Sequence, residues 1–243
     1  MSMKPALTLN INLATVLALK GSRPAAIKSS RSSTITVIAC GNAVGTCMPP
    51  FIIFKGKRKQ TELSEKCTAG TEIRMSETGW SNTELFKDFL ETHFLKYSMG
   101  SDADYKLLLY DAHASHINIG MIEWAREHKI VLFVLPPHTS HVTQPLDVGC
   151  FGPFKRHLYA ECAAFVRTNS IQTITKYNLG ELVWKVYPTA LSSKNIISSF
   201  KKTGIYPLLT AANFPCGRSS QDTIHKTGLQ VATQKHFLKK KIR

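Results

Sequence analysis

Two aspartates that follow apolar runs are the first residues of this chain whose types and positions could do chemistry. Asp111 interrupts the stretch "LLLYDAHASH" (Leu107–His116), and Asp147 lies in "LPPHTSHVTQPLDVGC" (Leu135–Cys150). The chain has only 16 acidic residues against 31 Lys and Arg, so the position of each carboxylate calls for an explanation. Carboxylate oxygens are the ligands that hard divalent cations such as Mg²⁺ prefer. The pair therefore predicts metal chemistry, in which ions hold the attacking and leaving oxygens of a phosphoryl transfer.

Other interpretations of these residues stay open at this point. An Asp ahead of a helix often caps its N-terminus, and a helix is expected after each aspartate. The same stretches also hold two pairs of histidines spaced by three, His113 with His116 and His138 with His141. Four imidazoles at adjacent strand ends could bind zinc. Two-metal sites generally need three or more carboxylates, because two hold the second ion poorly. The residues thus allow helix caps, a zinc site or an incomplete divalent-metal site.

The apolar patterns around the aspartates predict the elements that must position them. β-Branched and apolar runs at 34–40 and 48–54, separated by turn residues, predict a β-hairpin. Residues 105–110 and 129–135 predict two buried strands, and the helical pattern over 117–128 connects them. Such a strand–helix–strand unit implies parallel strands. Because ligand-binding residues of open α/β sheets gather beyond the carboxyl ends of strands, Asp111 and Asp147 are expected to face one cleft.

The rest of the chain is predicted to be mainly helical. The pattern Ser81-Asn-Thr-Glu84 resembles a capping box at the start of a helix over 81–97, with Trp80 placed for a hydrophobic staple. Further helices are expected over 151–168, 179–187 and 194–201, the last two separated by Pro188. Residues 1–33 predict one or two weak strands, and residues 209–243 a polar, basic and disordered tail.

The charge of the chain predicts a polyanionic partner. The formal net charge is +15 and the isoelectric point about 9.7, which favours nucleic acid. The candidates for phosphate contacts are Lys55, Lys57, Arg58 and Lys59 in one basic loop, and Lys155 and Arg156 at the start of a helix. The six cysteines form no CxxC pair, so reduced thiols in a nuclear or cytosolic protein are the simpler interpretation, and a nuclear location is expected. No apolar stretch is long enough to predict a membrane span.

Three segments together resemble a known family. They read "LLLYDAHASH", "VLFVLPPHTSHVTQPLDVGCFGPFKRH" and "KKTGIYPL", and they are similar to the DDE superfamily endonuclease domain of pogo/Tigger-type transposases and their jerky-like and centromere-protein-B-like relatives. The signatures Asp-x-x-x-x-His and His-x-x-Gln-Pro-Leu-Asp occur in order, with 35 residues between the two acids. The resemblance is clearest over 14–208.

This resemblance implies a fold and a chemistry. The fold would be RNase H-like: a mixed sheet of a hairpin plus parallel strands, flanked by helices, with a helical C-terminal part, all within one N-terminally truncated domain over 1–208. The family cuts and joins DNA with Mg²⁺ or Mn²⁺. Asp111 resembles its second metal-binding aspartate and Asp147 its third, which His141, Gln144 and Pro145 would present.

The chain departs from the family's pattern at the first aspartate. That residue belongs to the first strand, where this chain reads "MSMKPAL", and no Asp or Glu occurs before Glu62. We therefore expect a transposase-derived domain that binds DNA without cutting it, with no metal necessarily bound. One alternative is an active Mg²⁺- or Mn²⁺-dependent endonuclease in which Glu62, Glu72 or Glu77 substitutes. Another is a protein-interaction module that has lost DNA contact.

Overall fold

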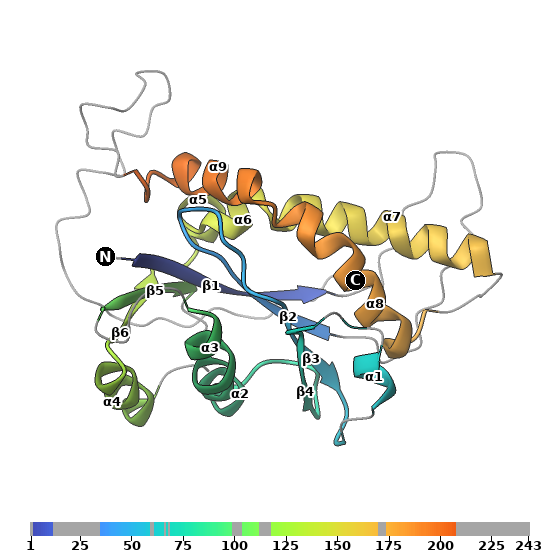
Figure 1. Cartoon of the computed structure of the whole chain (residues 1–243), viewed down its shortest axis with the longest axis horizontal. Coiled ribbons are helices and arrows are strands. Elements are labelled where there is room, and N and C mark those ends of the chain that lie inside the picture. Colours follow the sequence, from blue (N-terminus) through green and yellow to red (C-terminus); the bar gives the residue numbers. More distant parts are fainter. Residues whose placement is uncertain are drawn as a thin grey trace. The chain divides into compact units, whose positions relative to one another are not determined.

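The computed structural model describes residues 2–11, 35–58, 61–65, 67, 69–98, 104–111, 118–169 and 174–207, and of 2–11 the backbone only. The expected tail over 209–243 lies outside the described residues. In chain order (Figure 1) the elements are β1 (Ser2–Ile11), β2 (Ile35–Cys40), β3 (Phe51–Lys55), α1 (Glu62–Glu65), β4 (Glu72–Ser76), α2 (Thr83–Asp88), the π-helical turn η1 (Phe89–Phe94), α3 (Leu95–Tyr97), β5 (Lys106–Asp111), α4 (Ile119–Glu127), β6 (Ile130–Leu135), α5 (Ser140–Thr143), α6 (Pro145–Gly149), α7 (Phe151–Asn169), α8 (Lys176–Ala190) and α9 (Ser193–Thr203).

The described strands form one mixed sheet in the order β4-β3-β2-β1-β5-β6. β2 is antiparallel to both of its neighbours, β1 and β3, whereas the pairs β1–β5, β5–β6 and β3–β4 are parallel. All of these strands except β2 therefore run in one direction and end along the same edge of the sheet. We call this the carboxyl edge: it is the edge at which β3, β4, β5 and β6 end, and at which β2 begins. The predicted hairpin and the predicted parallel pair are both confirmed.

The strand order agrees with the fold that the resemblance implies. Three successive antiparallel strands, β1 to β3, continue on the other side of β1 into the parallel strands β5 and β6. Helices cover the sheet, and the chain from Phe151 onward is helical as far as it is described. The chain therefore has the predicted mixed α/β, RNase H-like fold. β4, which pairs with β3, extends the sheet by one strand that was not predicted.

Alternating side chains of the strands build a core on each face of the sheet. In β3, Ile52 and Phe54 belong to one apolar cluster and Phe51 and Ile53 to the other, since successive strand residues point to opposite faces. Helices α6–α9 complete the first cluster, with Leu146, Phe154, Leu182 and Phe200. α2, η1 and α4 complete the second, with Phe86, Phe89, Phe94 and Met121. Figure 1 shows these two groups of helices on opposite sides of the sheet. Burial on both faces explains the continuous apolar run "FIIF".

The prediction that residues 129–135 form a buried strand was only half right. β6 is a strand, but Val131, Phe133 and Val134 are 43%, 50% and 39% exposed. The reason is position: β6 is the outermost described strand on its side of the sheet, and Leu132 packs against the cluster that α4 completes. Apolar composition alone does not distinguish a central strand from an outer one.

Two helix boundaries also differ from the predictions. The helix predicted from Ser81 is capped by Asn82, whose side chain accepts a hydrogen bond from the Leu85 N–H at 2.8 Å. Trp80 therefore lies one position too early for a staple, and it is 49% exposed. Pro188, expected to separate two helices, lies inside α8. It falls in the last turn, so the one hydrogen bond that proline cannot donate affects only the end of α8, and Ala190 and Leu191 just beyond are buried in the core.

Candidate active site

Asp111 is the last residue of β5 and pairs with Leu135, the last residue of β6. Its carboxylate accepts a hydrogen bond from the Ser140 hydroxyl (Oγ to Oδ2, 3.1 Å). Ser140 is the first residue of α5, so the chain leaving β6 turns back onto the end of β5. The sequence did not single out Ser140, because a serine between two histidines carries no signal of its own. His113 and His116 lie outside the described residues.

Asp147 is presented by the short helix α6. Pro145, at the first helical position, has a φ that suits a helix start, and Pro145 and Leu146 are buried, so they anchor α6 to the core. Asp147 is in the first turn and remains exposed. The cap of α4 is Asn118, and Asp147 lies within α6. Neither aspartate is therefore the helix cap that the alternative interpretation predicted.

The Asp111 carboxylate lies close enough to influence the ionisation of Asp147. Burial of the Asp147 carboxyl group and the nearby Asp111 carboxylate raise the pKa of Asp147 to about 6, while Lys155 acts in the opposite direction. Because the residue as a whole is solvent-exposed, screening by water limits the energy involved. The structure thus brings together two acids that are far apart in sequence, with Lys155 of α7 beside them.

An open pocket of about 540 Å³ lies beside Asp147, lined also by His138, Ser140, His141 and Val148. The exposed Asp147 and the half-buried Asp111 near it fit one hard divalent cation that keeps most of its waters. They do not fit a two-ion site. Among the residues that the structure describes, no group of three or more His, Cys, Asp or Glu side chains is arranged for a metal, so the zinc interpretation gains no support there either.

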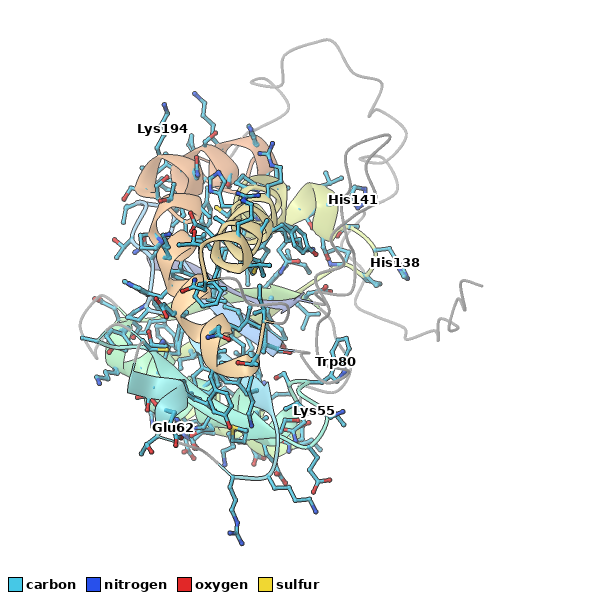
Figure 2. All side chains as sticks on the ribbon, turned by 90° about the vertical axis from the view of Figure 1, so that its right-hand side faces the viewer. Lys55, Glu62, Trp80, His138, His141 and Lys194 are labelled. Carbon is cyan, nitrogen blue, oxygen red and sulfur yellow. The ribbon has the colours of Figure 1, made fainter. Side chains whose placement is uncertain are left out.

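The acids considered as substitutes for the missing carboxylate lie elsewhere. Glu72 of β4 forms an ion pair with Arg74 at 2.8 Å, and Glu77, just after β4, pairs with Lys57 at 3.4 Å. Three strands separate β4 from β5, which at the usual strand spacing amounts to about 20 Å. Glu62 lies on α1, on the opposite side of the molecule from His138 and His141 in Figure 2. In the described structure these three acids therefore lie apart from Asp111 and Asp147.

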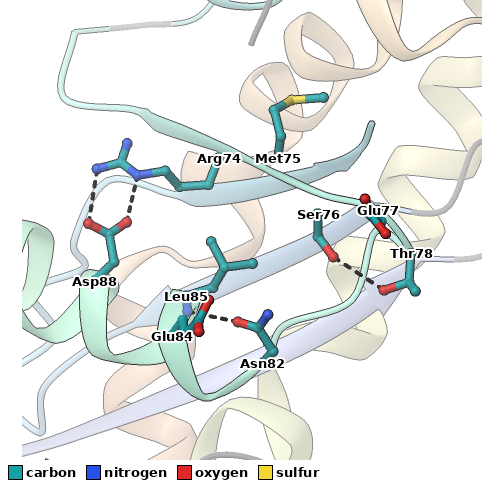
Figure 3. Close-up of a pocket in the computed structure, with 9 residues that line it drawn as sticks. All are labelled: Arg74, Met75, Ser76, Glu77, Thr78, Asn82, Glu84, Leu85 and Asp88. Carbon is teal, nitrogen blue, oxygen red and sulfur yellow. Dashed lines mark hydrogen bonds and ion pairs between the residues drawn. The ribbon is translucent and has the colours of Figure 1, made fainter. Parts of the chain in front are cut away.

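A second open pocket, of about 670 Å³, lies between β4 and α2 (Figure 3). Arg74 lines it, and its guanidinium donates to the Asp88 carboxylate from α2 and to Glu72. Asp88, one of the acids that line this pocket, is thus already held in an ion pair with Arg74. The pocket is larger than the one beside Asp147, but its described contacts hold β4 against α2.

The predicted phosphate-binding residues fall into two surface groups. Lys55, the last residue of β3, and Lys57 and Arg58 after it are exposed at the carboxyl edge, while Lys59 lies outside the described residues. Lys155 and Arg156 are exposed on α7. Sequence reasoning missed three further exposed cations on α9: Lys194, Lys201 and Lys202. Their signal was the amphipathic pattern of α9, with Ile196 and Phe200 buried and lysines on the other side.

Comparison with known proteins identifies the family. The family model described as DDE superfamily endonuclease matches residues 32–200. The chain belongs to the DDE superfamily endonucleases. The human "Pogo transposable element with KRAB domain" is 20% identical over 195 residues, 76% of this chain and 32% of that protein. Together these matches confirm the prediction of a transposase-derived DDE domain.

Other similar proteins are more varied. A Cochliobolus lunatus protein named "MFS-type transporter clz9" is 35% identical over 202 residues, which is 81% of this chain and 22% of that protein. Among solved structures, a Mos1 strand transfer complex has a TM-score of 0.47 at 9% identity and covers 83% of this chain and 51% of the Mos1 chain. A Mos1 transposase paired-end complex with left transposon end has a TM-score of 0.40 at 11% identity, covering 81% and 55%.

The DDE domain is a fraction of both curated relatives, spanning about a fifth of one and a third of the other. In the described part of the chain, every helix is too short or too polar to cross a membrane.

We expect the substitution Asp147→Asn to stabilise the fold near neutral pH. The pKa of Asp147 is raised from 3.8 to about 6 on folding, so the folded state binds more protons than the unfolded state between these values. Stability conferred by the protonated form is therefore present below about pH 4 and is lost as the pH rises toward 6. Asparagine cannot ionise. The variant should thus melt higher than the parent at neutral pH, by no more than a few °C given the exposure of the residue, and equally at about pH 4.

Thermal melting at both pH values, with and without Mg²⁺ or Mn²⁺, measures this difference. A divalent ion should raise the melting temperature of the parent, because it neutralises the Asp147 carboxylate. It should not raise that of Asp147→Asn, which lacks this carboxylate. Glu123→Gln, which removes one exposed carboxylate from α4, is the control and should show neither effect. Equal melting of parent and Asp147→Asn at neutral pH would contradict the raised pKa of Asp147.

Proposed function

We propose that this DDE domain binds DNA through its phosphate groups and does not cut it. The observation that carries the proposal is the carboxyl edge, where a pair of carboxylates lies on the same edge as exposed lysine and arginine side chains. The net charge of +15 supports a polyanionic partner, and attraction of this kind is independent of sequence. The nuclear location expected from the basic composition is part of the proposal, and exclusion of a fluorescent fusion from the nucleus would refute it.

The basic residues have positions suited to phosphate contacts. Lys155 is close enough to lower the pKa of Asp147, so a phosphate entering the pocket would meet a cation beside the acids. Arg156 follows it on the exposed side of α7, and Lys55 to Arg58 extend the positive charge along the carboxyl edge. Such contacts position a nucleic acid without reading its bases. The proposed binding is therefore sequence-tolerant and sensitive to salt.

The proposal of an inactive domain rests on the number of carboxylates. β1 adjoins β5 in the sheet, and its residues Ser2–Ile11 include no Asp or Glu. Asp111 and Asp147 would hold one Mg²⁺ or Mn²⁺ ion weakly, which would neutralise both carboxylates and leave coordination positions open to a phosphate oxygen. The two-ion arrangement that stabilises both the attacking and the leaving oxygen needs further ligands. On this proposal, the residues that remain favour binding over cleavage.

Titration of a labelled DNA duplex at several salt concentrations tests the binding. Each pair of phosphate contacts should lower the association constant about ten-fold between 50 and 200 mM salt. Replacing Lys155 and Arg156 together by alanine should reduce the slope of log K against log salt by about two. Replacing Lys87 and Lys96, on α2 and α3, removes the same charge at another place and should leave the slope nearly unchanged. Absence of binding at low salt, or an affinity that does not change with salt concentration, would favour the protein-interaction module.

A further inference from the structure

The carboxyl edge also carries a group of side chains that lie outside the acidic site. β3 and β4 are parallel to β5 and β6, so the loops that follow them emerge at the same edge as Asp111. Lys55 ends β3, and Trp80 follows β4 by four residues. Figure 2 shows Lys55 and Trp80 on the same side of the molecule as His138 and His141. Side chains from both ends of the sheet thus face one side.

The backbone holds Trp80 in place while its indole remains accessible. The carbonyl of Gly79 accepts a hydrogen bond from the Thr36 hydroxyl at the start of β2 (2.9 Å), and the Gly79 N–H donates to the Ser76 carbonyl (3.1 Å). Gly79 is buried with a φ of 81°, which only glycine adopts without strain. Trp80 next to it is 49% exposed. An anchored loop therefore presents a large apolar ring to solvent.

The indole of Trp80 differs from those of the other two tryptophans. Trp124 stacks on His128, with ring centroids 4.3 Å apart, and Trp184 stacks on Tyr187 at 6.4 Å. Among the described residues, no aromatic ring contacts Trp80 in this way. It neither completes the core nor staples the helix that follows, so its stacking face is available.

Several cations lie on the loop after β3, which is tied to the loop that carries Trp80. Gly56, next to Lys55, donates its N–H to the Ser76 carbonyl at 2.8 Å, which ties the loop after β3 to the loop after β4. Lys57 pairs with Glu77 at 3.4 Å, but their side chains are 83% and 74% exposed, so the pair is weak and a phosphate can compete for the lysine. Arg58 is exposed as well. An accessible aromatic ring beside several cations is the combination that binds unpaired nucleotides.

We propose that Trp80, Lys55, Lys57 and Arg58 form a site for unpaired nucleotides, with a base stacked on the indole and phosphates on the cations. The proposal rests on the nucleic-acid function proposed above and specifies the partner. A tryptophan can stack only on a base whose face is free, which excludes the interior of a duplex. Four strand spacings separate β4 from β5, about 20 Å, which corresponds to about six base pairs of duplex. A duplex with a single-stranded extension could therefore reach both ends of the carboxyl edge.

Fluorescence anisotropy with three labelled DNA probes tests this site at low salt. The probes are a single strand of about a dozen nucleotides, a blunt duplex, and the same duplex with a single-stranded overhang. Trp80→Ala should weaken binding of the single strand by roughly 5- to 100-fold and of the overhang probe in the same direction, and change blunt-duplex binding less than about two-fold. Trp80→Phe, which keeps an aromatic face, should retain most of the affinity.

Tyr105→Ala provides the matched control. Tyr105 is also an exposed aromatic residue, at 59%, but it precedes β5 and so lies at the opposite edge of the sheet. Its loss should leave all three affinities unchanged. If Trp80→Ala and Tyr105→Ala bind the single strand equally well, or if the parent binds only the blunt duplex, the unpaired-nucleotide site is refuted while DNA binding stands. If the parent binds none of the probes, both proposals fail.

Discussion

Supercoiled plasmid incubated with the purified chain and Mn²⁺ should remain uncut. Enzymes of phosphoryl transfer act mainly by stabilising charge with positioned groups, and removing one such group elsewhere costs about 10²- to 10³-fold in rate. The loss of a carboxylate that holds a metal should cost at least as much, because the ion itself is then misplaced. The described structure offers Asp111 and Asp147 and places Glu62, Glu72 and Glu77 away from them. Nicking should not exceed that in buffer with Mn²⁺ alone.

The variants Asp111→Ala and Asp147→Ala make this result decisive. If the site is inactive, both should behave as the parent does, and both should still bind DNA because lysine and arginine side chains make the proposed phosphate contacts. Nicking by the parent that each variant abolishes would mean that another acid completes the site, and the proposal of an inactive domain would be wrong. Nicking that survives in both variants would indicate a contaminating nuclease.

The substitution Gly149→Ala should strongly destabilise the fold. α6 packs against α9 at this glycine: a Cβ added to Gly149 would lie 2.1 Å from the Ser199 Oγ and 3.1 Å from the Ser199 Cβ. Ser199 is fully buried and its hydroxyl donates to the Asn195 carbonyl at 2.6 Å, so it cannot turn away freely. Overpacking of this kind costs about 2–3 kcal/mol, which lowers the melting temperature of a domain of this size by roughly 5–10 °C.

Two further variants separate this clash from other effects of alanine. Gly152 lies one turn further along, at the start of α7, and a Cβ there would meet nothing within 4 Å. Gly152→Ala should therefore be neutral or stabilise slightly, because alanine favours helix over glycine. Ser199→Gly removes both atoms that clash and should restore most of the stability lost in Gly149→Ala. Equal melting of the two single alanine variants would show that α6 does not pack on α9 as described.

Local sequence patterns predicted the central strands and helices because the buried positions of these elements carry apolar residues. The strands β2, β3 and β5 and the helices around Phe154 and Phe200 carry such patterns. β4 reads "EIRMS", and its two charged residues, Glu72 and Arg74, gave no strand signal. It becomes a strand by pairing with β3, over Phe51 to Lys55, which no local pattern encodes. The exposure of β6 likewise depends on which strands lie beyond it.

The candidate site could be predicted in part for a related reason. Asp111 and Asp147 follow strands, so the direction of two parallel strands was enough to bring them together. Ser140 contributes through a turn whose geometry the sequence did not reveal. Trp80 was predicted to pack on the helix that follows it. The sequence did not reveal β4 or its direction, and therefore did not show at which edge of the sheet the loop with Trp80 emerges. Sequence reasoning thus missed the residues whose positions depend on the pairing of strands that are far apart in the sequence.

The pairing of β1 has a consequence for the order of assembly during synthesis. Ser2 lies opposite Lys106 in the sheet, so β1 is made about 100 residues before its parallel partner. At typical translation rates of about 5–20 residues per second, this interval lasts roughly 5–20 s. β1 can meanwhile pair with β2, which follows soon after it, and with that hairpin await β5. Asp111 and Asp147 are both made after β1, β2 and β3, so the acidic pocket is completed only after the growing chain has kept one side of β1 unpaired.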